Sequence, residues 1–198
     1  NKIDWCAALL DERLPENREL QIIRGSVDHL RALLQRTRMH TGRVVLNPGD
    51  CDVRALFEQI IRETPHTDAL RIEIDRCDDA PLYCDPSHVR EALTNLVGNA
   101  VEAMRGSGRI TLSYVRTARK ASVSVCDDGP GITPAAQKRI FEPYYTTKTS
   151  GENFGLGLYY CQNVMNVHEG SIRVSSAPGK GCTFTLIFPL AAQGRRKP

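Results

Sequence analysis

Two asparagines stand four residues apart in the segment LTNLVGNAVEAM, residues 93–104. Asn95 and Asn99 fall on the polar side of a helical pattern, because the apolar residues around them recur at intervals of three and four. Asparagine is a mediocre helix former, so two of them in one helix indicate either a solvated face or a ligand. An amide oxygen is a hard, uncharged metal ligand of the kind that Mg²⁺ accepts. The rest of the chain has to decide between these interpretations.

Glycine-rich segments supply the second kind of candidate chemistry. In CDDGPGI, residues 126–132, the glycines follow a strand-like run and allow close approaches, while Asp127 or Asp128 can accept a hydrogen bond from a ligand. In GENFGLGL, residues 151–158, the glycines open a helix-like segment whose first backbone N–H groups suit a phosphate. A third segment, GKGCTFTL at 179–186, is also compatible with a plain hairpin turn. Each pattern alone is a weak signal, and the first also fits a calcium-type loop.

These residues need elements that hold them in place. The asparagine helix is expected to start at Asp85-Pro86, an N-cap followed by proline at the first helical position. Its apolar stripe consists of Val89, Leu93, Leu96, Val97, Ala100, Val101 and Met104. The turn signal NPGD at 47–50 precedes another helix. We expect strands at 44–46, 70–75, 80–85, 108–115, 121–128, 170–176 and 182–190, and further helices at 53–62 and 155–168.

The N-terminal part has a different pattern. Residues 1–10 are compatible with a helix, and LPEN at 14–17 interrupts them. From Glu16 the apolar residues recur at intervals of three and four, as in a helix packed against other helices. They are Leu20, Ile23, Val27, Leu30 and Leu34. This pattern predicts a helical hairpin with a shortened first arm, followed by an α/β sandwich of one sheet layer and one helix layer.

Composition excludes several classes of protein. With 198 residues, 41% hydrophobic and 25% charged, the chain is typical of a folded globular protein. It has no run of about 18 apolar residues and no signal-peptide pattern, so we expect a cytoplasmic segment without membrane contact, with a membrane anchor upstream in the full-length protein left open. A net charge of +3 is too small to indicate nucleic acid. Seven scattered cysteines without a C-x-x-C pair indicate reduced thiols, mostly buried, rather than disulfides or a zinc site.

Taken in order, NLVGNAVEA, DDGPGI, FEPYYTTK, GLGL and GKGCTF resemble the sequence boxes of the GHKL ATPase superfamily. They are most similar to the catalytic ATP-binding domain of bacterial sensor histidine kinases. The resemblance is dense over 85–189 and looser over 1–81. It implies the Bergerat fold, a two-layer α/β sandwich whose mixed sheet is covered by helices on one face. It also implies a partial dimerisation hairpin at 1–42, an ATP-binding domain at 43–190 and a disordered tail at 191–198.

The resemblance assigns roles to the candidate residues. Asn99 matches the Mg²⁺ ligand of the family, and Asn95 lies on the same face as a second polar contact. Asp127 matches the aspartate that accepts the adenine amino group, which favours ATP over GTP. The glycines would wrap the adenine at Gly129 and Gly131 and present amides to the triphosphate at Gly155 and Gly157. The same resemblance places Ile132, Phe141, Tyr144, Tyr145, Thr147, Lys148, Leu156, Leu158 and Thr183 around the nucleotide.

The segment between the glycine patches is similar to the ATP lid of these kinases. Phe141 and one of the two following tyrosines would pack the lid, although plain core packing also fits them. The TTK ending resembles the nitrogen-regulatory group, in which Lys148 approaches the terminal phosphates as a mobile charge. A solvated lysine is the alternative for that position. Asn153 and Glu102 depart from the family pattern, the first at a lid glycine and the second at a position that is basic in several subfamilies.

The resemblance implies transfer of the ATP γ-phosphoryl group to a histidine and then to the aspartate of a response-regulator receiver domain. In the family the acceptor histidine is followed by an acidic residue on the first hairpin helix. His168 is followed by Glu169 but also by a turn and strand, so we expect it to be structural. We therefore expect the acceptor upstream of Asn1, with His29 as the dissenting candidate, and dimerisation of the full-length protein through the hairpin.

Two other functions remain open on sequence grounds. One is a GHKL serine kinase of the anti-sigma type, which the preceding helical hairpin disfavours. The other is a degenerate docking module that no longer turns over nucleotide, which the intact asparagines and glycines disfavour. A mismatch-repair or topoisomerase ATPase fits less well, because those sites need a general-base carboxylate where this chain has Asn95.

Overall fold

The structure is a computed structural model that describes residues 46–65, 69–146 and 155–190. The predicted hairpin at 1–42, the tail at 191–198, and Thr147, Lys148 and Asn153 lie outside the described residues. In chain order the elements are β1 (Gly49–Cys51), α3 (Val53–Glu63), β2 (Leu70–Cys77), β3 (Leu82–Cys84), α4 (Pro86–Ala103), β4 (Gly108–Arg116), β5 (Lys120–Asp127), α5 (Pro134–Gln137), α6 (Gly157–Val167), β6 (Ser171–Ser176) and β7 (Cys182–Pro189).

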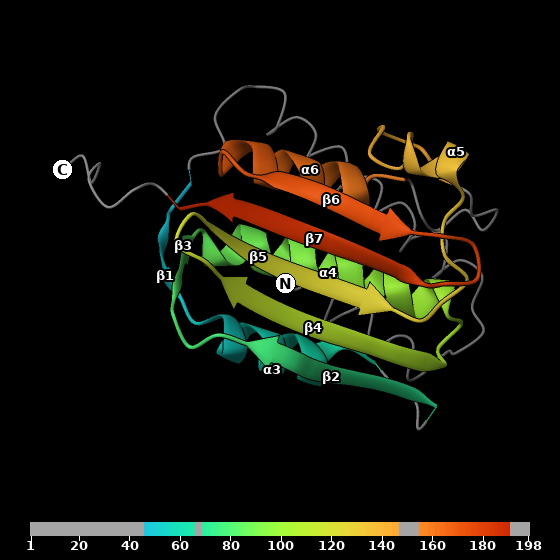
Figure 1. The fold of residues 1–198 in the computed structure, drawn as a ribbon, viewed down its shortest axis with the longest axis horizontal. Helices are drawn as coiled ribbons and strands as arrows, with labels where there is room; N and C mark the ends of the chain where they lie inside the picture. The colour runs from blue at the N-terminus through green and yellow to red at the C-terminus, as the bar shows by residue number, and fades with distance from the viewer. Residues whose placement is uncertain (1–45, 66–68, 147–154, 191–198) are drawn as a thin grey trace, which may run out of the picture.

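The main sheet is mixed and has five strands in the order β2-β4-β5-β7-β6. β2 is parallel to β4, and the other neighbours are antiparallel. β1 and β3 form a separate antiparallel ribbon. Helices α3, α4 and α6 lie behind one face of the sheet, as Figure 1 shows. The predicted two-layer α/β sandwich is confirmed, and β6 and β7 form a hairpin, as the segment GKGCTFTL allowed.

The core lies between the sheet and this helix layer. On β5, alternate residues from Ala121 to Asp127 are buried and the residues between them are half-buried, so one face of the strand points to the helices. The predicted stripe of α4 is buried throughout, apart from the half-buried Val101. Amphipathic patterning therefore fixed which faces of the strands and of α4 meet.

Helix α4 begins as the sequence predicts. Asp85 is the N-cap, and its carboxylate accepts hydrogen bonds from the backbone N–H groups of Ser87 and His88, at 3.0 and 3.3 Å. Its other oxygen accepts from the N–H of Asn47 at 2.8 Å. Four satisfied contacts around a 3% exposed carboxylate, the Ser87 hydroxyl included, make this a structural aspartate.

His168 joins the end of α6 to the start of α4. Its Nε2 accepts the N–H of Asp85 at 3.0 Å, and its Nδ1 donates to the carbonyl of Val164 at 2.7 Å. The ring also packs edge-on against Phe188, with 5.7 Å between the ring centroids. Both ring nitrogens are engaged within the fold, as expected for a structural histidine. The two helices therefore run antiparallel, with the end of α6 beside the start of α4 (Figure 1).

Some predicted boundaries were wrong. Leu46 is not in a strand, and β1 comes three residues later, so Asp50 lies in a strand and Asp52 caps α3 by accepting from Ala55 N–H at 3.0 Å. Helix α6 begins at Gly157, because Gly155 has a φ of +65° that no right-handed helix accommodates. The segment after β5 contains the short helix α5, whose cap, Thr133, accepts from Ala136 N–H.

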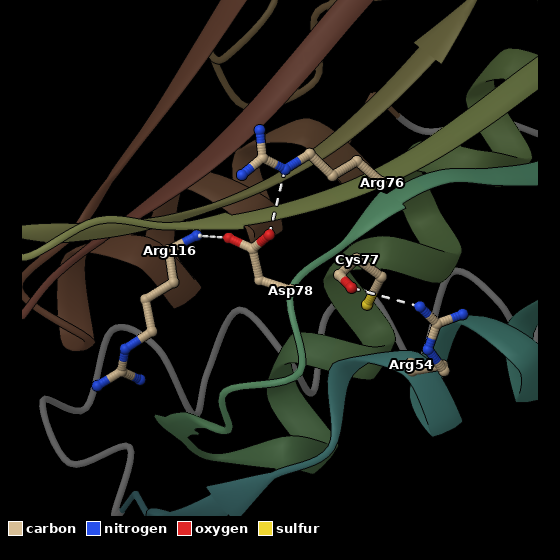
Figure 2. Close-up of polar contacts among 5 residues, drawn as sticks. All are labelled: Arg54, Arg76, Cys77, Asp78 and Arg116. Atoms are coloured by element: carbon tan, nitrogen blue, oxygen red, sulfur yellow. Dashed lines mark hydrogen bonds and ion pairs between the residues drawn. The ribbon is translucent and has the colours of Figure 1, made fainter.

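Polar contacts tie β2 to its surroundings at the end of the sheet away from α5. Figure 2 shows Asp78 between Arg76 and Arg116: its carboxylate accepts from Arg76 Nε at 3.1 Å and from the backbone N–H of Arg116 at 2.8 Å. These contacts, the backbone bond first, lower the pKa of the Asp78 carboxyl. Nearby, Arg54 donates to the carbonyl of Cys77 at 3.3 Å. The backbone of Arg116 and the side chain of Arg54 thus tie β4 and α3 to the end of β2, whereas Arg76 pairs within its own segment.

Candidate functional site

The C-terminal half of α4 meets the first residue of α6. Asn95 and Asn99 are both half-buried, one turn apart on α4. A Cβ added to Gly157 would lie 3.4 Å from Asn95 Oδ1, so the asparagine side chain sits directly against the N-terminus of α6. The structure therefore brings together Asn95 and the second glycine patch, which are about sixty residues apart in the chain.

The N-terminus of α6 is held against the 144–145 segment. A Cβ added to Gly155 would lie 2.5 Å from the carbonyl oxygen of Tyr145, and Tyr144 N–H donates to the carbonyl of Gly155 at 3.1 Å. Leu156 is the N-cap residue, and no side chain caps this helix among the described residues. The half-buried Gly157 and Leu158 thus begin a helix whose first amides have no side-chain cap in the described part of the chain, and such amides can bind an anion.

Asp127 ends β5 with its side chain turned towards the helix layer. It is 8% exposed, and its Oδ1 accepts the N–H of Gly129 at 3.0 Å. Burial raises the pKa of the Asp127 carboxyl, and although hydrogen bonds from the backbone of Gly129 and Cys182 act in the opposite direction, the net shift is upward. A buried carboxylate with few donors retains the capacity to accept a hydrogen bond from a ligand.

The neighbouring carboxylate has a different role. Asp128 is exposed, and its Oδ1 accepts the backbone N–H of Arg109 at 2.9 Å, while its own N–H donates to the carbonyl of Arg109 at 3.3 Å. A Cβ on Gly108 would lie 2.5 Å from Asp128 Oδ1. Of the two aspartates that the sequence offered at this strand end, Asp128 fastens the start of β4 and Asp127 faces inward.

The third glycine patch is part of the same construction. Gly181 N–H donates to the carbonyl of Gly129 at 3.0 Å, and Gly179 N–H donates to the carbonyl of Pro130 at 2.7 Å. A Cβ on Gly181 would lie 2.0 Å from the carbonyl oxygen of Asp127, and one on Gly131 would lie 2.1 Å from that of Ala177. The β6–β7 turn therefore packs directly on the loop that follows Asp127.

Sequence reasoning missed two residues that fix this loop. The hydroxyl of Ser176 accepts the N–H of Ile132 at 2.8 Å and donates to the carbonyl of Gly181 at 2.6 Å. The amide of Gln137 donates to the carbonyls of Ile132 and Ser176, at 2.8 and 2.9 Å. Serine on a strand and glutamine on a short helix carry no sequence signal for this role, since each has one partner 39 or 44 residues away.

The predicted lid aromatics have three different environments. Phe141 is half-buried and packs edge-on against Phe184, with 6.4 Å between ring centroids. Tyr145 is half-buried beneath the guanidinium of Arg139, 4.6 Å from the ring centroid. Tyr144 is 47% exposed and has a φ of +66°, which is uncommon for a non-glycine residue. Phe141 packs against the core, and Tyr144 is the most exposed of the three side chains.

Thr183 does not join the inner cluster. On β7 it pairs with Cys126, on the sheet face away from the helices, whereas Cys182 pairs with Asp127 and is buried. The pleat therefore gives the inward position to Cys182 instead of Thr183. Burial raises the pKa of the Cys182 thiol to about 12, and the charge of Asp127 adds to that shift. Cys182 is the first of four alternate residues of β7 that are buried, the others being Phe184, Leu186 and Phe188.

Residues 84–192, more than half of the chain, match the family described as histidine kinase-, DNA gyrase B-, and HSP90-like ATPase. The chain belongs to this family. The match includes both asparagines, Asp127 and all the glycine patches. The grouping that the sequence boxes predicted is therefore confirmed at the level of the family.

Curated relatives narrow the type of domain. The histidine-protein kinase AtoS of Escherichia coli is 41% identical over 118 residues, which cover 59% of this chain and 19% of AtoS. The adaptive-response sensory kinase SasA of Crocosphaera subtropica is 40% identical over 126 residues, covering 62% of this chain and 33% of SasA. The chain thus spans less than half the length of these relatives, and the matched part is a histidine kinase catalytic domain. The serine-kinase alternative is not favoured.

Solved structures agree on the fold. The full-length ShkA structure in complex with AMPPNP has a TM-score of 0.74 at 26% identity, covering 90% of this chain and 40% of that one. The nucleotide-free catalytic domain of ThkA has a TM-score of 0.61 at 25% identity, covering 73% and 96%. Acinetobacter baumannii AdeS, at 20% identity and a TM-score of 0.71, supports the fold alone.

Three further findings concern the described residues only. None of their helices is long and apolar enough to cross a membrane. No three histidine, cysteine, aspartate or glutamate side chains gather among them in a way that would hold a metal ion. The cysteines in this part of the chain are free thiols, four buried and two half-buried, in agreement with the prediction of reduced, mostly buried cysteines.

Proposed function

We propose that this chain binds ATP with Mg²⁺ and transfers the γ-phosphoryl group to a histidine of a sensor kinase, for relay to a response-regulator aspartate. The observation that carries the proposal is the geometry of Asp127. Its buried carboxylate ends a strand beside glycine-built loops, while Asn95 and the N-terminus of α6 stand together on the helix layer. An adenine acceptor and a phosphate-binding helix end on one domain fit a nucleoside triphosphate.

Adenine recognition would depend on Asp127. Its carboxylate accepts hydrogen bonds and donates none when ionised, so it pairs with the amino group of adenine and repels the carbonyl that guanine carries at the same position. The amide of Gly129 orients one carboxylate oxygen. The loop around Gly131, Ile132 and the β6–β7 turn would form the wall beside the base, with Cys182 under the carboxylate.

The phosphates would lie between α4 and α6. Mg²⁺, when bound, would neutralise charge on the β- and γ-phosphates and orient the transferred group. Asn99 would hold it through an amide oxygen, with Asn95 as a second polar contact, and the remaining ligands would be phosphate oxygens and water. This donor set fits a domain in which no group of carboxylates or histidines gathers among the described residues. Gly155, Leu156, Gly157 and Leu158 would present backbone to the phosphates.

Transfer to a histidine is preferred to free hydrolysis because of Asn95. An ATPase that activates water needs a general base beside the metal site, and an amide cannot accept the proton. The chain's own residues would therefore position the γ-phosphoryl group and leave the attacking nitrogen to the acceptor helix. Of the two histidines that the structure describes, His168 has both ring nitrogens engaged and His88 contacts the Tyr160 hydroxyl, which supports an acceptor outside the described residues.

Finer assignments extend this proposal. The TTK ending supports membership of the nitrogen-regulatory group, in which Thr147 and Lys148 would approach the terminal phosphates and Phe141, Tyr144 and Tyr145 would form the lid. The receiver domain of a response regulator would be the phosphoryl acceptor partner. The full-length protein would dimerise through the hairpin at 1–42 and work in the cytoplasm.

Calorimetric titration with AMPPNP tests the nucleotide site. Wild-type protein should bind AMPPNP with Mg²⁺ in the micromolar range, and a GTP analogue should bind far more weakly. Asn99→Ala should make the affinity for AMPPNP independent of Mg²⁺, and Asp127→Asn should weaken binding about tenfold to a hundredfold by removing a charged acceptor. Absence of binding by folded wild-type protein would refute the proposal and favour the docking-module alternative.

A further inference from the structure

A buried polar cluster connects α4 and α6 one turn away from the asparagine contact. The hydroxyl of Tyr160 donates to Glu91 Oε2 at 2.5 Å, and His88 Nδ1 lies 3.1 Å from the same hydroxyl oxygen. Tyr160 is only 6% exposed, while His88 and Glu91 are half-buried. Since the hydroxyl proton goes to the carboxylate, His88 Nδ1 must be the donor in the second bond.

The position of this cluster along the two helices indicates its role. Tyr160 comes one turn after Gly157 on α6, and Glu91 comes one turn before Asn95 on α4. Because the helices are antiparallel, the Tyr160–Glu91 bond lies directly beside the contact between Asn95 and Gly157. A shift of α6 along its axis that opened one contact would break the other.

Two more contacts lie along the same seam. Cys161 Sγ approaches the carbonyl of Ala92 at 3.4 Å, and His168 holds the Asp85 amide at the far end. An apolar side chain at position 160 would pack the helices but would tolerate small rotations. A tyrosine fixed between a carboxylate and an imidazole has one bonding geometry, so it sets the register of the helices as well as their contact. Burial and the adjacent Glu91 raise the pKa of Tyr160, which keeps its hydroxyl a donor.

We propose that Tyr160 is a positioning residue for the nucleotide site: its hydroxyl, fixed by Glu91 and His88, holds the N-terminus of α6 in the register with Asn95 that triphosphate binding requires. This inference rests on the proposed ATP site. It assigns to Tyr160 no contact with nucleotide, since its effect passes through α6 and α4. The adenine end of the site, built on Asp127, does not depend on this seam.

The test compares two ligands in variants of the same seam. Titration with Mg²⁺ and AMPPNP reports the triphosphate site, and an NMR titration with adenosine, which lacks phosphates, reports the adenine end. Tyr160→Phe should weaken AMPPNP binding about tenfold, the loss expected for one hydrogen bond to a charged group, and leave adenosine binding unchanged. Glu91→Ala should have the same effect, and the double variant should lose no more than either single one. Glu91→Gln, which keeps an acceptor oxygen, should recover most of the affinity.

Tyr114→Phe is the matched control, because Tyr114 is a fully buried tyrosine on β4 that takes no part in the seam. It should leave both affinities unchanged. If Tyr160→Phe weakens both ligands equally, or neither, while wild type binds AMPPNP, the positioning role is wrong. If Tyr160→Phe fails to fold, the contrast between Glu91→Ala and Glu91→Gln decides the matter in the same way. Failure of wild type to bind AMPPNP would overturn the ATP site itself.

Discussion

Asp85 and Asp127 are the two buried carboxylates in the part of the chain that the structure describes. Asp85 caps the start of α4 and Asp127 ends β5, and the start of α4 and the end of β5 lie at opposite ends of the sheet (Figure 1). Asp85 accepts from the backbone of Asn47, Ser87 and His88 and from the Ser87 hydroxyl. Burial acts to raise its pKa, but these bonds outweigh burial and lower it to about 2. Asp127 has far fewer donors, and burial raises its pKa. The carboxylate is buried at both positions, but its hydrogen-bonding capacity is filled by the fold at Asp85 and only partly filled at Asp127.

The surroundings of the two carboxylates differ in the same sense. Around Asp85 the polar groups bond to one another within the fold. His168 Nε2 accepts the Asp85 N–H, and Asp78 accepts the N–H of Arg116 at the end of β4. Around Asp127 the chain is built of glycines at contacts where a Cβ would collide with backbone. Those glycines let the loops around Asp127 approach one another closely. A site for a ligand is thus distinguished here by incomplete satisfaction of a buried charge, more than by burial itself.

The largest expected effect comes from the glycine turn at the Asp127 end. Gly179 and Gly181 both have a φ near +72°, but a Cβ would meet nothing within 4 Å at Gly179 and would lie 2.0 Å from the Asp127 carbonyl oxygen at Gly181. Gly181→Ala should destabilise the protein by about 3 kcal/mol or more and abolish nucleotide binding, whereas Gly179→Ala should cost only the left-handed strain, about 1–2 kcal/mol. Urea unfolding measures the loss of stability in both variants. Equal losses would mean that the turn does not pack on the Asp127 loop.

The fall in the free energy of unfolding at acid pH should depend on Asp85. Its pKa of about 2 lies below the value of about 3.9 of an unfolded aspartate, so its contribution is full above pH about 4 and is lost as pH falls to about 2. The contribution is about 2 kcal/mol, measured by urea unfolding across this pH range. Asp127 has the opposite effect on stability: its pKa is raised in the folded state, so its ionisation opposes folding. Asp85→Asn protein should lack the Asp85 part of the acid loss; an unchanged pH profile would contradict the comparison.

The smallest expected effect is at the exposed arginine network in Figure 2. Arg76 is 62% exposed in its pair with Asp78, so the charge pair is screened by solvent. Arg76→Ala should leave both the free energy of unfolding and nucleotide affinity unchanged within error, because the backbone N–H of Arg116 still holds Asp78. A large loss of stability in thermal unfolding would show that this end depends on ion pairing, contrary to the account based on buried backbone contacts.

Sequence patterns predicted what is local. The alternation of β2, β4, β5 and β7 and the stripe of α4 follow from side-chain periods, and Asp85-Pro86 marks a helix start in two adjacent residues. The register of the strands could not be predicted from the sequence, because a shift of one residue would turn Thr183 inward in place of Cys182. The different roles of Asp127 and Asp128 depend on Arg109, which lies on another strand.

The residues of the site that could be predicted are those that belong to the sequence motifs of the family. Asn95 and Gly157 were expected together and are in contact range, yet the contact of Tyr160 with Glu91 joins residues 69 positions apart and has no local pattern. Thr147 and Lys148 stay predictions, since they lie outside the described residues. Long-range contacts between polar side chains are what the chain's periodicity cannot encode.

The most direct test of the account compares Asp127→Asn with Asp85→Asn by urea unfolding at neutral pH without nucleotide. Asp85→Asn places an amide donor among backbone donors and should lower the free energy of unfolding by about 2 kcal/mol. Asp127→Asn removes a buried charge that opposes folding, so its free energy of unfolding should equal or exceed that of wild type. A loss for Asp127→Asn as large as that for Asp85→Asn would show that Asp127, too, is held for the fold, and the account of a carboxylate reserved for ligand would be wrong.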